Sequence, residues 1–408
     1  MRYVLIGNSA AGIGAAAGIR QVDTQGEIII ITNEAHHTYS RPLISYFLAG
    51  KVTGEKMKYR GDGFYTENNC KLLTDTTVTE INPSGKQVTL TDGKSLWYDK
   101  LLVAAGSSAF VPPFEGLDTV AGKYTFMSLD DARQLDAVLE ENKRVLIIGG
   151  GLIGLKCAEG ILGRVSRITV VDMAPRVLSS ILDEDGAGIV QNRLESNGIN
   201  FVLGHSVKRF EKDTAVLENG DTIDFDILVL AVGVRPNTAL LKGIADIDKG
   251  IVINSRSETT APDIYAAGDC TQTIDVSSGQ AKIMALLPNA YMQGEVAGIN
   301  MAGGDGAFDK AMPMNAICFS GLHIITAGNY VGEVYAETES GCYKRLFYSD
   351  NKLNGFILIG NVEKAGIYTS LIRKKTPLDT IDFALICEKP GLMAFTKEDR
   401  MVKLGGIV

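Results

Sequence analysis

The chain has 408 residues, 45% of them hydrophobic, and a formal net charge of −8. This length allows two or three domains, the hydrophobic share excludes global disorder, and the acidic balance argues against non-specific nucleic-acid binding. Glycine accounts for 45 of the 408 residues, a larger share than the usual one of about 7%. This excess favours turns that bring the backbone close to a ligand.

The six cysteines and four histidines are scattered along the chain. No CxxC or CxxxxC pair occurs, so neither a disulfide framework nor a metal centre is expected, and a reducing cytoplasm is the expected location. No apolar run is long enough to span a bilayer.

The first 34 residues predict a strand, a turn, a helix and a second strand. Segment 2–7 is typical of a buried strand, and this interpretation is preferred to a signal peptide. The turn at 7–12 matches the GxGxxG dinucleotide fingerprint except that Ser9 replaces the middle glycine. A degenerate fingerprint of this kind also fits a plain strand–helix–strand core.

The chemistry expected of this turn is the binding of a pyrophosphate. Gly7 permits the tight turn, Gly12 allows close packing of helix and strand, and the helix N-terminus offers free N–H groups. Glu34, after the second strand, can accept hydrogen bonds from a ribose diol.

A second unit begins at the strand 144–149 and fits the fingerprint fully. The strand at 167–172 ends in Asp172, about 20 residues further on, which favours NADH over NADPH because a carboxylate repels a 2′-phosphate. Arg176 lies nearby and can pair with a 2′-phosphate, so NADPH stays the alternative coenzyme. The residues expected to bind NAD here are Gly149, Gly151, Leu152, Ile153, Gly154 and Asp172. Two fingerprints in one chain predict two dinucleotides, NAD(H) and FAD.

The chain as a whole resembles the two-dinucleotide-fold flavoproteins, the pyridine nucleotide–disulfide oxidoreductase superfamily. Within it, the rubredoxin and ferredoxin reductases and the flavin part of nitrite reductase are the most similar branch. Segments in the family's order carry the resemblance: a crossover at 99–113 with Ala105-Gly106-Ser107 in place of Ala-Thr-Gly, a strand and turn at 226–241 containing Gly233, a Gly268-Asp269 pair, and a helix near 286–304. Taken singly, each segment also fits a buried strand or an ordinary turn.

The resemblance implies an α/β fold with two nested Rossmann-like domains and a C-terminal α+β capping or interface domain. The implied FAD-binding domain is 1–109 with 239–310, the NAD(P)-binding domain is 110–238, and the interface domain is 311–408, which in the family often mediates dimerisation. A hairpin with its turn near Asp350-Asn351 is expected in the last of these.

The resemblance also implies cofactor contacts. Gly233 is expected near the nicotinamide nucleotide. The residues expected to bind FAD are Gly7, Ser9, Ala10, Ala11, Gly12, Glu34, Arg41, Pro42, Val78, Ala105, Gly106, Gly268, Asp269, Pro288, Asn289 and Ala290.

The segment 39–42 resembles the YxRP of the reductase branch, and it lies in a stretch without cysteine, so dithiol chemistry is not expected. Tyr46 stands where relatives have a lysine, and Lys156 stands where they have its glutamate partner. We therefore expect Tyr46 and Lys156 to be catalytic as a coupled change, with Lys156 supplying a cation to the flavin. The alternative is that Lys156 is an exposed helix lysine.

The predicted function is that of an FAD-dependent NAD(P)H oxidoreductase, with NADH preferred. Hydride transfer to flavin N5 would pass electrons between NADH and an iron–sulfur or rubredoxin-type carrier or partner subunit. The alternatives are a peroxide-forming NADH oxidase and an NADH-sensing flavoprotein resembling apoptosis-inducing factor. A basic run at 373–375 is either a docking patch or a solvated face.

Overall fold

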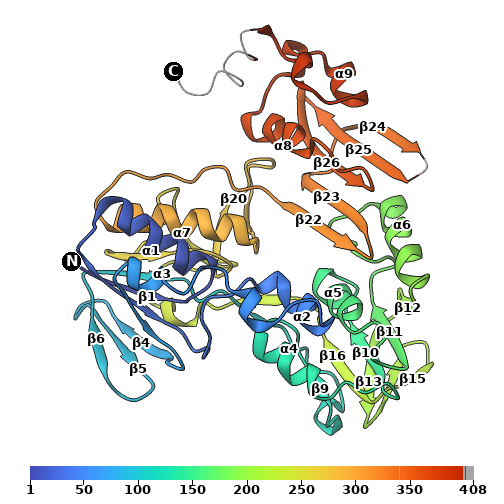
Figure 1. The fold of residues 1–408 in the computed structure, drawn as a ribbon, viewed down its shortest axis with the longest axis horizontal. Helices are drawn as coiled ribbons and strands as arrows, with labels where there is room; N and C mark the ends of the chain where they lie inside the picture. The colour runs from blue at the N-terminus through green and yellow to red at the C-terminus, as the bar shows by residue number, and fades with distance from the viewer. Residues whose placement is uncertain (340, 398–399, 401–408) are drawn as a thin grey trace. The chain divides into compact units, whose positions relative to one another are not determined.

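The computed structural model describes residues 1–339, 341–397 and 400, which divide into two compact units (Figure 1). The first unit comprises residues 1–177, 195–274 and 281–311. The second comprises residues 178–194, 275–280 and the described residues from 312 onward. The predicted third domain, 311–408, includes residues 340, 398–399 and 401–408, which lie outside the described residues.

A parallel five-stranded sheet in the first unit has the strand order β19-β7-β1-β2-β3. Its central strands are almost wholly aliphatic and buried, as expected for strands covered on both faces. The strands are β1 (Arg2–Ile6), β2 (Glu27–Ile31), β3 (Cys70–Leu73), β7 (Lys100–Val103) and β19 (Ile264–Ala266). The strands predicted at both ends of the first fingerprint are therefore confirmed.

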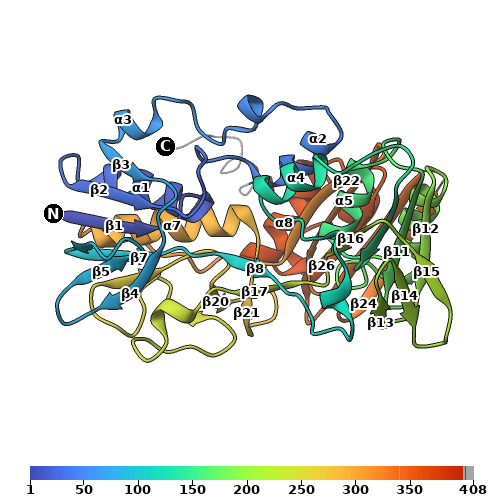
Figure 2. The same cartoon turned by 90° about the horizontal axis from the view of Figure 1, so that it is seen from below.

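Two glycine-rich helices, α1 (Ala10–Val22) and α7 (Leu287–Met301), pack side by side against this sheet (Figure 2). A Cβ atom added at Gly294 would lie 2.0 Å from the carbonyl oxygen of Ala11. One added at Gly18 would lie 2.1 Å from the carbonyl oxygen of Glu295. The small residues of α1 and α7 are therefore required by the close approach of the two helix backbones.

A second parallel sheet in the same unit has the order β12-β11-β10-β16-β9. Its strands are β9 (Lys123–Tyr124), β10 (Arg144–Ile148), β11 (Arg167–Asp172), β12 (Ile199–Leu203) and β16 (Ile227–Leu230). The associated helices are α4 (Leu129–Asp136) and α5 (Leu152–Gly160). The strand–turn–helix–strand unit predicted from the second fingerprint is confirmed.

The two points where the chain crosses between the sheets are hydrogen-bonded to each other. Strand β8 (Ser107–Ala109) pairs antiparallel with β17 (Val234–Pro236), so Ser107 lies opposite Pro236. This ladder lies at the boundaries expected for the nested domains, and the boundaries themselves stay a prediction.

Smaller elements complete the first unit. These are the antiparallel strands β4 (Val78–Asn82), β5 (Gln87–Leu90) and β6 (Ser95–Trp97), the strands β13 (Val207–Glu211), β14 (Thr214–Leu217) and β15 (Thr222–Asp224), the strands β18 (Ile251–Val252), β20 (Thr271–Ile274) and β21 (Ala281–Ile283), and the helices α2 (Ile44–Leu48) and α3 (Phe64–Glu67).

The second unit is built on an antiparallel sheet with the order β22-β23-β26-β25-β24. Its elements are β22 (Met314–Phe319), β23 (Leu322–Gly328), β24 (Glu333–Glu339), β25 (Cys342–Ser349), β26 (Lys352–Ile359), α8 (Ala365–Lys374) and α9 (Phe383–Glu388). The predicted hairpin is confirmed: β25 and β26 are joined by Asp350 and Asn351, whose φ values of 49° and 59° suit a two-residue hairpin turn.

Helix α6 (Glu184–Glu195) belongs, except for its last residue, to this second unit although its sequence lies between two strands of the second parallel sheet. The Tyr343 hydroxyl donates a 2.6 Å hydrogen bond to Asp183, immediately before the helix. Gly186 faces the side chains of Tyr343 and Ile359. The antiparallel sheet thus packs on a segment from much earlier in the chain, since Asp183 precedes Tyr343 by 160 residues.

Candidate cofactor site

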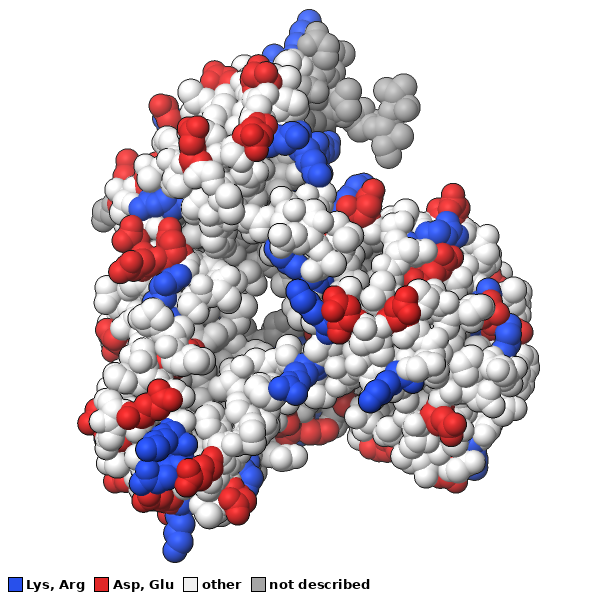
Figure 3. All heavy atoms as spheres, turned by 180° about the vertical axis from the view of Figure 1, so that it is seen from behind, with Lys and Arg blue, Asp and Glu red and all other residues white. Residues whose placement is uncertain are grey.

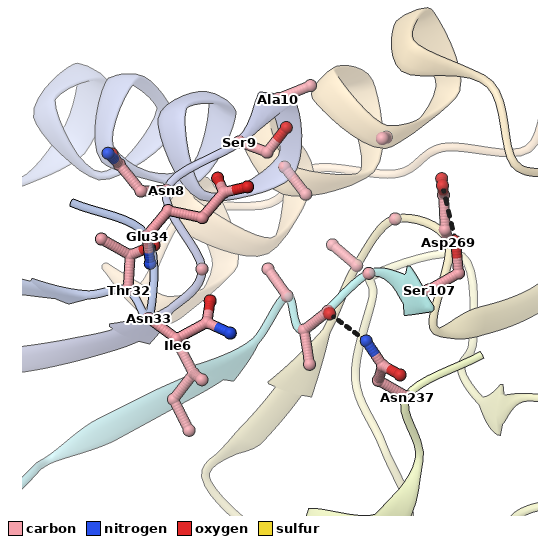
Figure 4. Close-up of a pocket in the computed structure, with 18 of the residues that line it drawn as sticks. Ile6, Asn8, Ser9, Ala10, Thr32, Asn33, Glu34, Ser107, Asn237 and Asp269 are labelled. Atoms are coloured by element: carbon pink, nitrogen blue, oxygen red, sulfur yellow. Dashed lines mark hydrogen bonds between the residues drawn. The ribbon is translucent and has the colours of Figure 1, made fainter. Parts of the chain in front are cut away.

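The first parallel sheet carries a cavity of about 250 Å³ at the carboxyl ends of β1, β2 and β7 (Figure 4). Open α/β sheets bind ligands at this edge. Of the residues expected to bind FAD, those lining the cavity are Gly7, Ser9, Ala10, Ala11, Glu34, Arg41, Val78, Ala105, Gly106, Gly268, Asp269 and Ala290. Gly12, Pro42, Pro288 and Asn289 are not among the lining residues.

The turn at 7–12 leaves no room for side chains at its two outer glycines. Gly7 has φ 122°, and a Cβ atom there would lie 2.2 Å from the carbonyl oxygen of Ala104. A Cβ atom at Gly12 would lie 1.9 Å from the carbonyl oxygen of Gly7. Ser9, at the middle position, has φ −100°, which any residue adopts, so the missing middle glycine causes no backbone strain.

Glu34 is held in a fixed orientation at one end of the cavity. The Tyr39 hydroxyl donates to it at 2.9 Å, and the Arg41 guanidinium donates to both carboxylate oxygens at 3.1 and 3.2 Å. Arg41 also donates to the carbonyl oxygen of Met127 at 3.2 Å. Each carboxylate oxygen has more than one lone pair, so Glu34 can still accept hydrogen bonds from a ribose diol.

Asp269 lies at the other end of the cavity, well away from Glu34 (Figure 4). Burial raises the pKa of Asp269, and the nearby Arg41 charge and Ser107 oppose this rise. The Ser107 hydroxyl donates to Asp269 at 3.5 Å. The cavity therefore has a carboxylate at each end and a helix N-terminus with free N–H groups between them, which fits a dinucleotide with hydroxyl groups on both sides of its phosphates.

Several lining residues were missed from the sequence. Asn237 lines the cavity, and its amide donates to the carbonyl oxygen of Ala105 at 2.8 Å and accepts from Ser108 at 2.7 Å. Asn237 lies within the strand and turn expected at 226–241, and it reaches the cavity because β17 pairs with β8. The other missed lining residues are Ile6, Asn8, Ile31, Thr32, Asn33, Thr76, Thr77, Ala104, Ser107, Met127, Leu240, Ala267 and Leu287. Asn8 lies within the fingerprint turn, and its place there could have suggested it.

The second fingerprint has the same construction as the first. A Cβ atom at Gly149, which has φ 115°, would lie 2.3 Å from the carbonyl oxygen of Ala231, and one at Gly154 would lie 2.0 Å from that of Gly149. A Cβ atom at Gly151 would meet nothing within 4 Å. The N-terminus of α5 is thus open at Gly151, where a phosphate can approach the backbone.

Asp172 ends β11 beside this turn. Its carboxylate accepts hydrogen bonds from the backbone N–H groups of Gly150 at 2.6 Å and Ala174 at 2.7 Å, which fix its orientation. Gly233 is exposed and has φ 119°. The roles of these residues toward NAD stay predictions.

Comparison with known proteins identifies the family. The family described as "Pyridine nucleotide-disulphide oxidoreductase" matches residues 1–294, and that described as "Rubredoxin NAD+ reductase C-terminal domain" matches residues 313–376. The chain belongs to the pyridine nucleotide–disulphide oxidoreductase family. Its cofactors are FAD and NAD(H).

Relatives of this oxidoreductase cover nearly the whole chain. It is 32% identical over 391 residues to the NADH-dependent phenylglyoxylate dehydrogenase subunit epsilon of Aromatoleum evansii, covering 92% of each chain. It is 31% identical over 446 residues to an NADH oxidase of Methanocaldococcus jannaschii, covering 99% of each. It is 29% identical over 367 residues to an NADH-rubredoxin oxidoreductase of Clostridium acetobutylicum, covering 88% of this chain and 91% of the relative.

Solved structures support the fold. The structure of NADH:rubredoxin oxidoreductase from Clostridium acetobutylicum matches with a TM-score of 0.76 at 26% identity, covering 93% of this chain and 96% of the other. The covalent putidaredoxin reductase–putidaredoxin complex matches with a TM-score of 0.88 at 23% identity, covering 100% and 99%. The second likeness shows the fold alone.

The thiols of this oxidoreductase are poorly suited to redox exchange. Burial raises the pKa of Cys70, Cys270 and Cys387 to about 11 and raises that of Cys157 as well. Among the described residues, which include all six cysteines, no disulfide forms and no cysteine lines the cavity. Since the thiolate is the reactive form, these four side chains are weak nucleophiles at neutral pH.

Asp172→Ala is expected to raise the Kd for NADH by roughly 10- to 100-fold, because a hydrogen bond to a charged group contributes about 1.5–3 kcal/mol. The Kd for NADPH should change less, since its 2′-phosphate gains no favourable contact from the aspartate. Titration of each coenzyme would measure both constants. Asp118→Ala, which changes an exposed aspartate within the expected NAD(P)-binding domain, is the control and should leave both constants unchanged. An equal loss for both coenzymes would contradict the role of Asp172 in discrimination.

Proposed function

We propose that the chain passes electrons between NADH and a small one-electron carrier of the iron–sulfur or rubredoxin type, or a partner subunit that holds such a centre. The observation that carries this proposal is the combination of a dinucleotide cavity and a second dinucleotide turn in one compact unit, with no cysteine lining the cavity. The names of two relatives support this proposal: one is an NADH-rubredoxin oxidoreductase, and the other is a subunit of an NADH-dependent dehydrogenase.

The residues of the chain would bind and orient the cofactors. Glu34 would hold the adenosine ribose of FAD, the N-terminus of α1 its pyrophosphate, and Asp269 the hydroxyls beyond it. Asp172 would hold the adenosine ribose of NADH. When bound, FAD supplies exchange between a two-electron donor and a one-electron acceptor. The protein contributes position and the exclusion of water, and no side chain has to act as a nucleophile.

An NADH oxidase is the second candidate, and the relative from Methanocaldococcus jannaschii favours it. A flavoprotein whose conformation or oligomeric state responds to NADH is a third. These candidates differ in turnover: the first transfers electrons rapidly to a carrier, the second to oxygen, and the third to neither.

The experiment follows NADH oxidation by the FAD-loaded protein with a purified rubredoxin, a purified ferredoxin, or oxygen alone. Reduction of at least one carrier at 10 times the peroxide-forming rate or faster is the expected result, roughly 1.4 kcal/mol in barrier height. Treatment with iodoacetamide should change the carrier rate less than about twofold, because no cysteine lines the cavity. Oxygen consumption as fast as carrier reduction, or inactivation by alkylation, would contradict the proposal.

The remaining finer predictions concern assembly and location. We propose a homodimer, which sedimentation velocity would test, and a cytoplasmic location. Among the described residues, no helix has both the length and the apolar character needed to cross a bilayer.

Of the basic run, Arg373 is partly buried at the end of α8, while Lys374 and Lys375 are exposed. Acidic and basic side chains are interspersed on the face shown in Figure 3, so the docking patch stays a prediction.

A further inference from the structure

The segment that follows β2 contacts the helices of the second parallel sheet in two places. In the first contact, the Nζ atom of Lys156 in α5 lies 5.2 Å from the centroid of the Tyr46 ring in α2. Neither residue is among those lining the cavity, and their expected catalytic role stays a prediction. The Lys156 side chain is only 19% exposed, so the alternative of an exposed helix lysine is wrong. The second contact joins residues 34–41 to the N-terminus of α4, and this one reaches the cavity.

Tyr39 lies at the centre of the second contact and is only 7% exposed. Its hydroxyl donates to a carboxylate oxygen of Glu34 at 2.9 Å and accepts a 3.0 Å hydrogen bond from the backbone N–H of Leu129. Leu129 is the first residue of α4, and the first N–H groups of a helix have no partner within the helix. Tyr39 therefore provides one of these missing partners and also holds a side chain that lines the cavity.

The chemistry of the three groups fixes the direction of both hydrogen bonds. The backbone N–H of Leu129 can only donate, so the Tyr39 oxygen accepts from it. The Glu34 carboxylate can only accept, so the hydroxyl proton points toward it. Burial raises the pKa of Tyr39, so the hydroxyl keeps this proton. The positive end of the α4 dipole also polarises the hydroxyl and strengthens its donation to Glu34.

Arg41 is the other donor to Glu34, and it is less constrained than Tyr39. Its side chain lines the cavity and is 35% exposed, so a bound cofactor with phosphate groups can compete for its N–H groups. Tyr39 is not among the lining residues, and both hydrogen bonds of its hydroxyl end on groups of the protein. The orientation of Glu34 in the loaded site therefore depends on Tyr39 more than on Arg41.

Hydrogen bonds on both sides of Tyr39 bind the start of the same helix. The Nε2 atom of His36 lies 2.6 Å from a carboxylate oxygen of Asp130, and Arg41 donates to the carbonyl oxygen of Met127 at 3.2 Å. Met127 itself lines the cavity. The residues at the start of α4 thus contribute to the wall of the first cavity, although they fall within the range expected for the NAD(P)-binding domain, 110–238.

We infer that Tyr39 is a positioning residue for FAD: anchored on the N-terminus of α4, it holds Glu34 in the orientation that binds the adenosine ribose. This inference rests on the proposed function, which assigns that ribose to Glu34. Without the hydroxyl, Glu34 loses its buried donor and the N–H of Leu129 loses its acceptor. The carboxylate must then be ordered as the cofactor binds, which weakens binding. Tyr39→Phe is therefore expected to raise the Kd for FAD by about tenfold.

The experiment is a double-mutant cycle on the FAD affinity of the apoprotein, measured by titration with FAD. Glu34→Ala alone should weaken FAD binding, because it removes the acceptor for the ribose. Tyr39→Phe should raise the Kd by about tenfold in the wild type but by less than about twofold in the Glu34→Ala protein. An equal effect of Tyr39→Phe in both backgrounds would overturn the inference, since Tyr39 would then act on the fold and not through the carboxylate. No effect in the wild type would overturn it as well.

Two nucleotide probes test whether the ribose hydroxyls are the groups concerned. ADP contains the adenosine ribose and the phosphates of FAD, and 2′,3′-dideoxy-ADP lacks both hydroxyls of that ribose. Each probe competes with FAD for the apoprotein. Tyr39→Phe should weaken the competition by ADP about tenfold and that by 2′,3′-dideoxy-ADP less than about twofold. Equal weakening of both probes would show that Tyr39 does not act on ribose binding, contrary to the inference.

Tyr343→Phe is the matched control. Tyr343 is also buried, and its hydroxyl donates to the carboxylate of Asp183 at 2.6 Å within the second unit. Both variants lose a buried hydrogen bond to a carboxylate, so both should lower the melting temperature of the apoprotein. Only Tyr39→Phe should change the affinity for FAD. A similar loss of FAD affinity in Tyr343→Phe would mean that general destabilisation explains the effect, and the inference would fail.

The outcomes distinguish this inference from the proposed function. Full FAD affinity in Glu34→Ala would show that Glu34 does not hold the ribose, and the inference would fail with that assignment. Weakened binding in Glu34→Ala without coupling to Tyr39 would remove the inference alone. If Tyr39 and Glu34 are coupled as expected but no carrier is reduced, the proposed acceptor is wrong while the role of Tyr39 stands.

Discussion

Protein carrying Gly12→Val is expected to purify without flavin. The added side chain would begin 1.9 Å from the carbonyl oxygen of Gly7, so the turn that forms the middle of the cavity cannot keep its shape. A loss of FAD affinity of at least about 100-fold, roughly 2.7 kcal/mol, is expected because the N–H groups of the α1 N-terminus would be displaced from the pyrophosphate. The ratio of absorbance near 450 nm to that at 280 nm, and titration of the apoprotein with FAD, measure this effect.

Gly188→Ala in α6 is the matched control, because a Cβ atom there would meet nothing within 4 Å. Alanine is also favoured over glycine inside a helix, so this variant should be as stable as the wild type or slightly more so. It should bind FAD normally. A yellow Gly12→Val protein with unchanged FAD affinity would show that the first glycine-rich turn is not the flavin site.

The second large effect is expected from Gly154→Val, which should keep FAD and lose the response to NADH. Its Cβ atom would lie 2.0 Å from the carbonyl oxygen of Gly149, so the α5 turn would be distorted while the first turn stays intact. The rate of flavin bleaching by NADH should fall by about 100-fold or more, because the pyrophosphate loses its backbone contacts. Stopped-flow absorbance measures that rate.

Dithionite, which needs no nucleotide site, should reduce the flavin of Gly154→Val at the wild-type rate. The two glycine variants together form a crossed test: one removes the flavin, and the other removes only the electron donor. Loss of flavin from Gly154→Val, or normal bleaching by NADH, would contradict the assignment of the second turn to NAD(H).

Local pattern was sufficient to predict the two strand–turn–helix–strand units and the hairpin at Asp350-Asn351. These features depend on neighbouring residues. A turn glycine, or an alternating or continuous run of apolar residues, can be recognised within a few positions of the sequence. The cavity was predicted in the same way at Gly7, Ser9 and Glu34, where the fingerprint itself supplies the lining.

Contacts between distant segments could not be predicted from local sequence patterns. Asn237 lines the cavity because β17 pairs with β8, more than 100 residues earlier, and no pattern near Asn237 reports that pairing. The exposure of Lys156 was also undecided, because its burial depends on a ring 110 positions away in α2. The residues of helix α6 fall within the range expected for the NAD(P)-binding domain, 110–238, and their membership of the second unit follows from contacts with Tyr343 and Ile359.

The capture of α6 by the antiparallel sheet has a consequence for how the protein can be made and divided. Residues 178–194 are synthesised long before β25 and β26. The apolar side of this helix therefore stays exposed to solvent until those strands have been made. Truncation at residue 311 would leave that side permanently uncovered, and a C-terminal fragment starting at 312 would lack the helix against which its strands pack. Neither half is then a self-sufficient module, and trimming the chain to its nucleotide-binding part should yield aggregation in place of a smaller working enzyme.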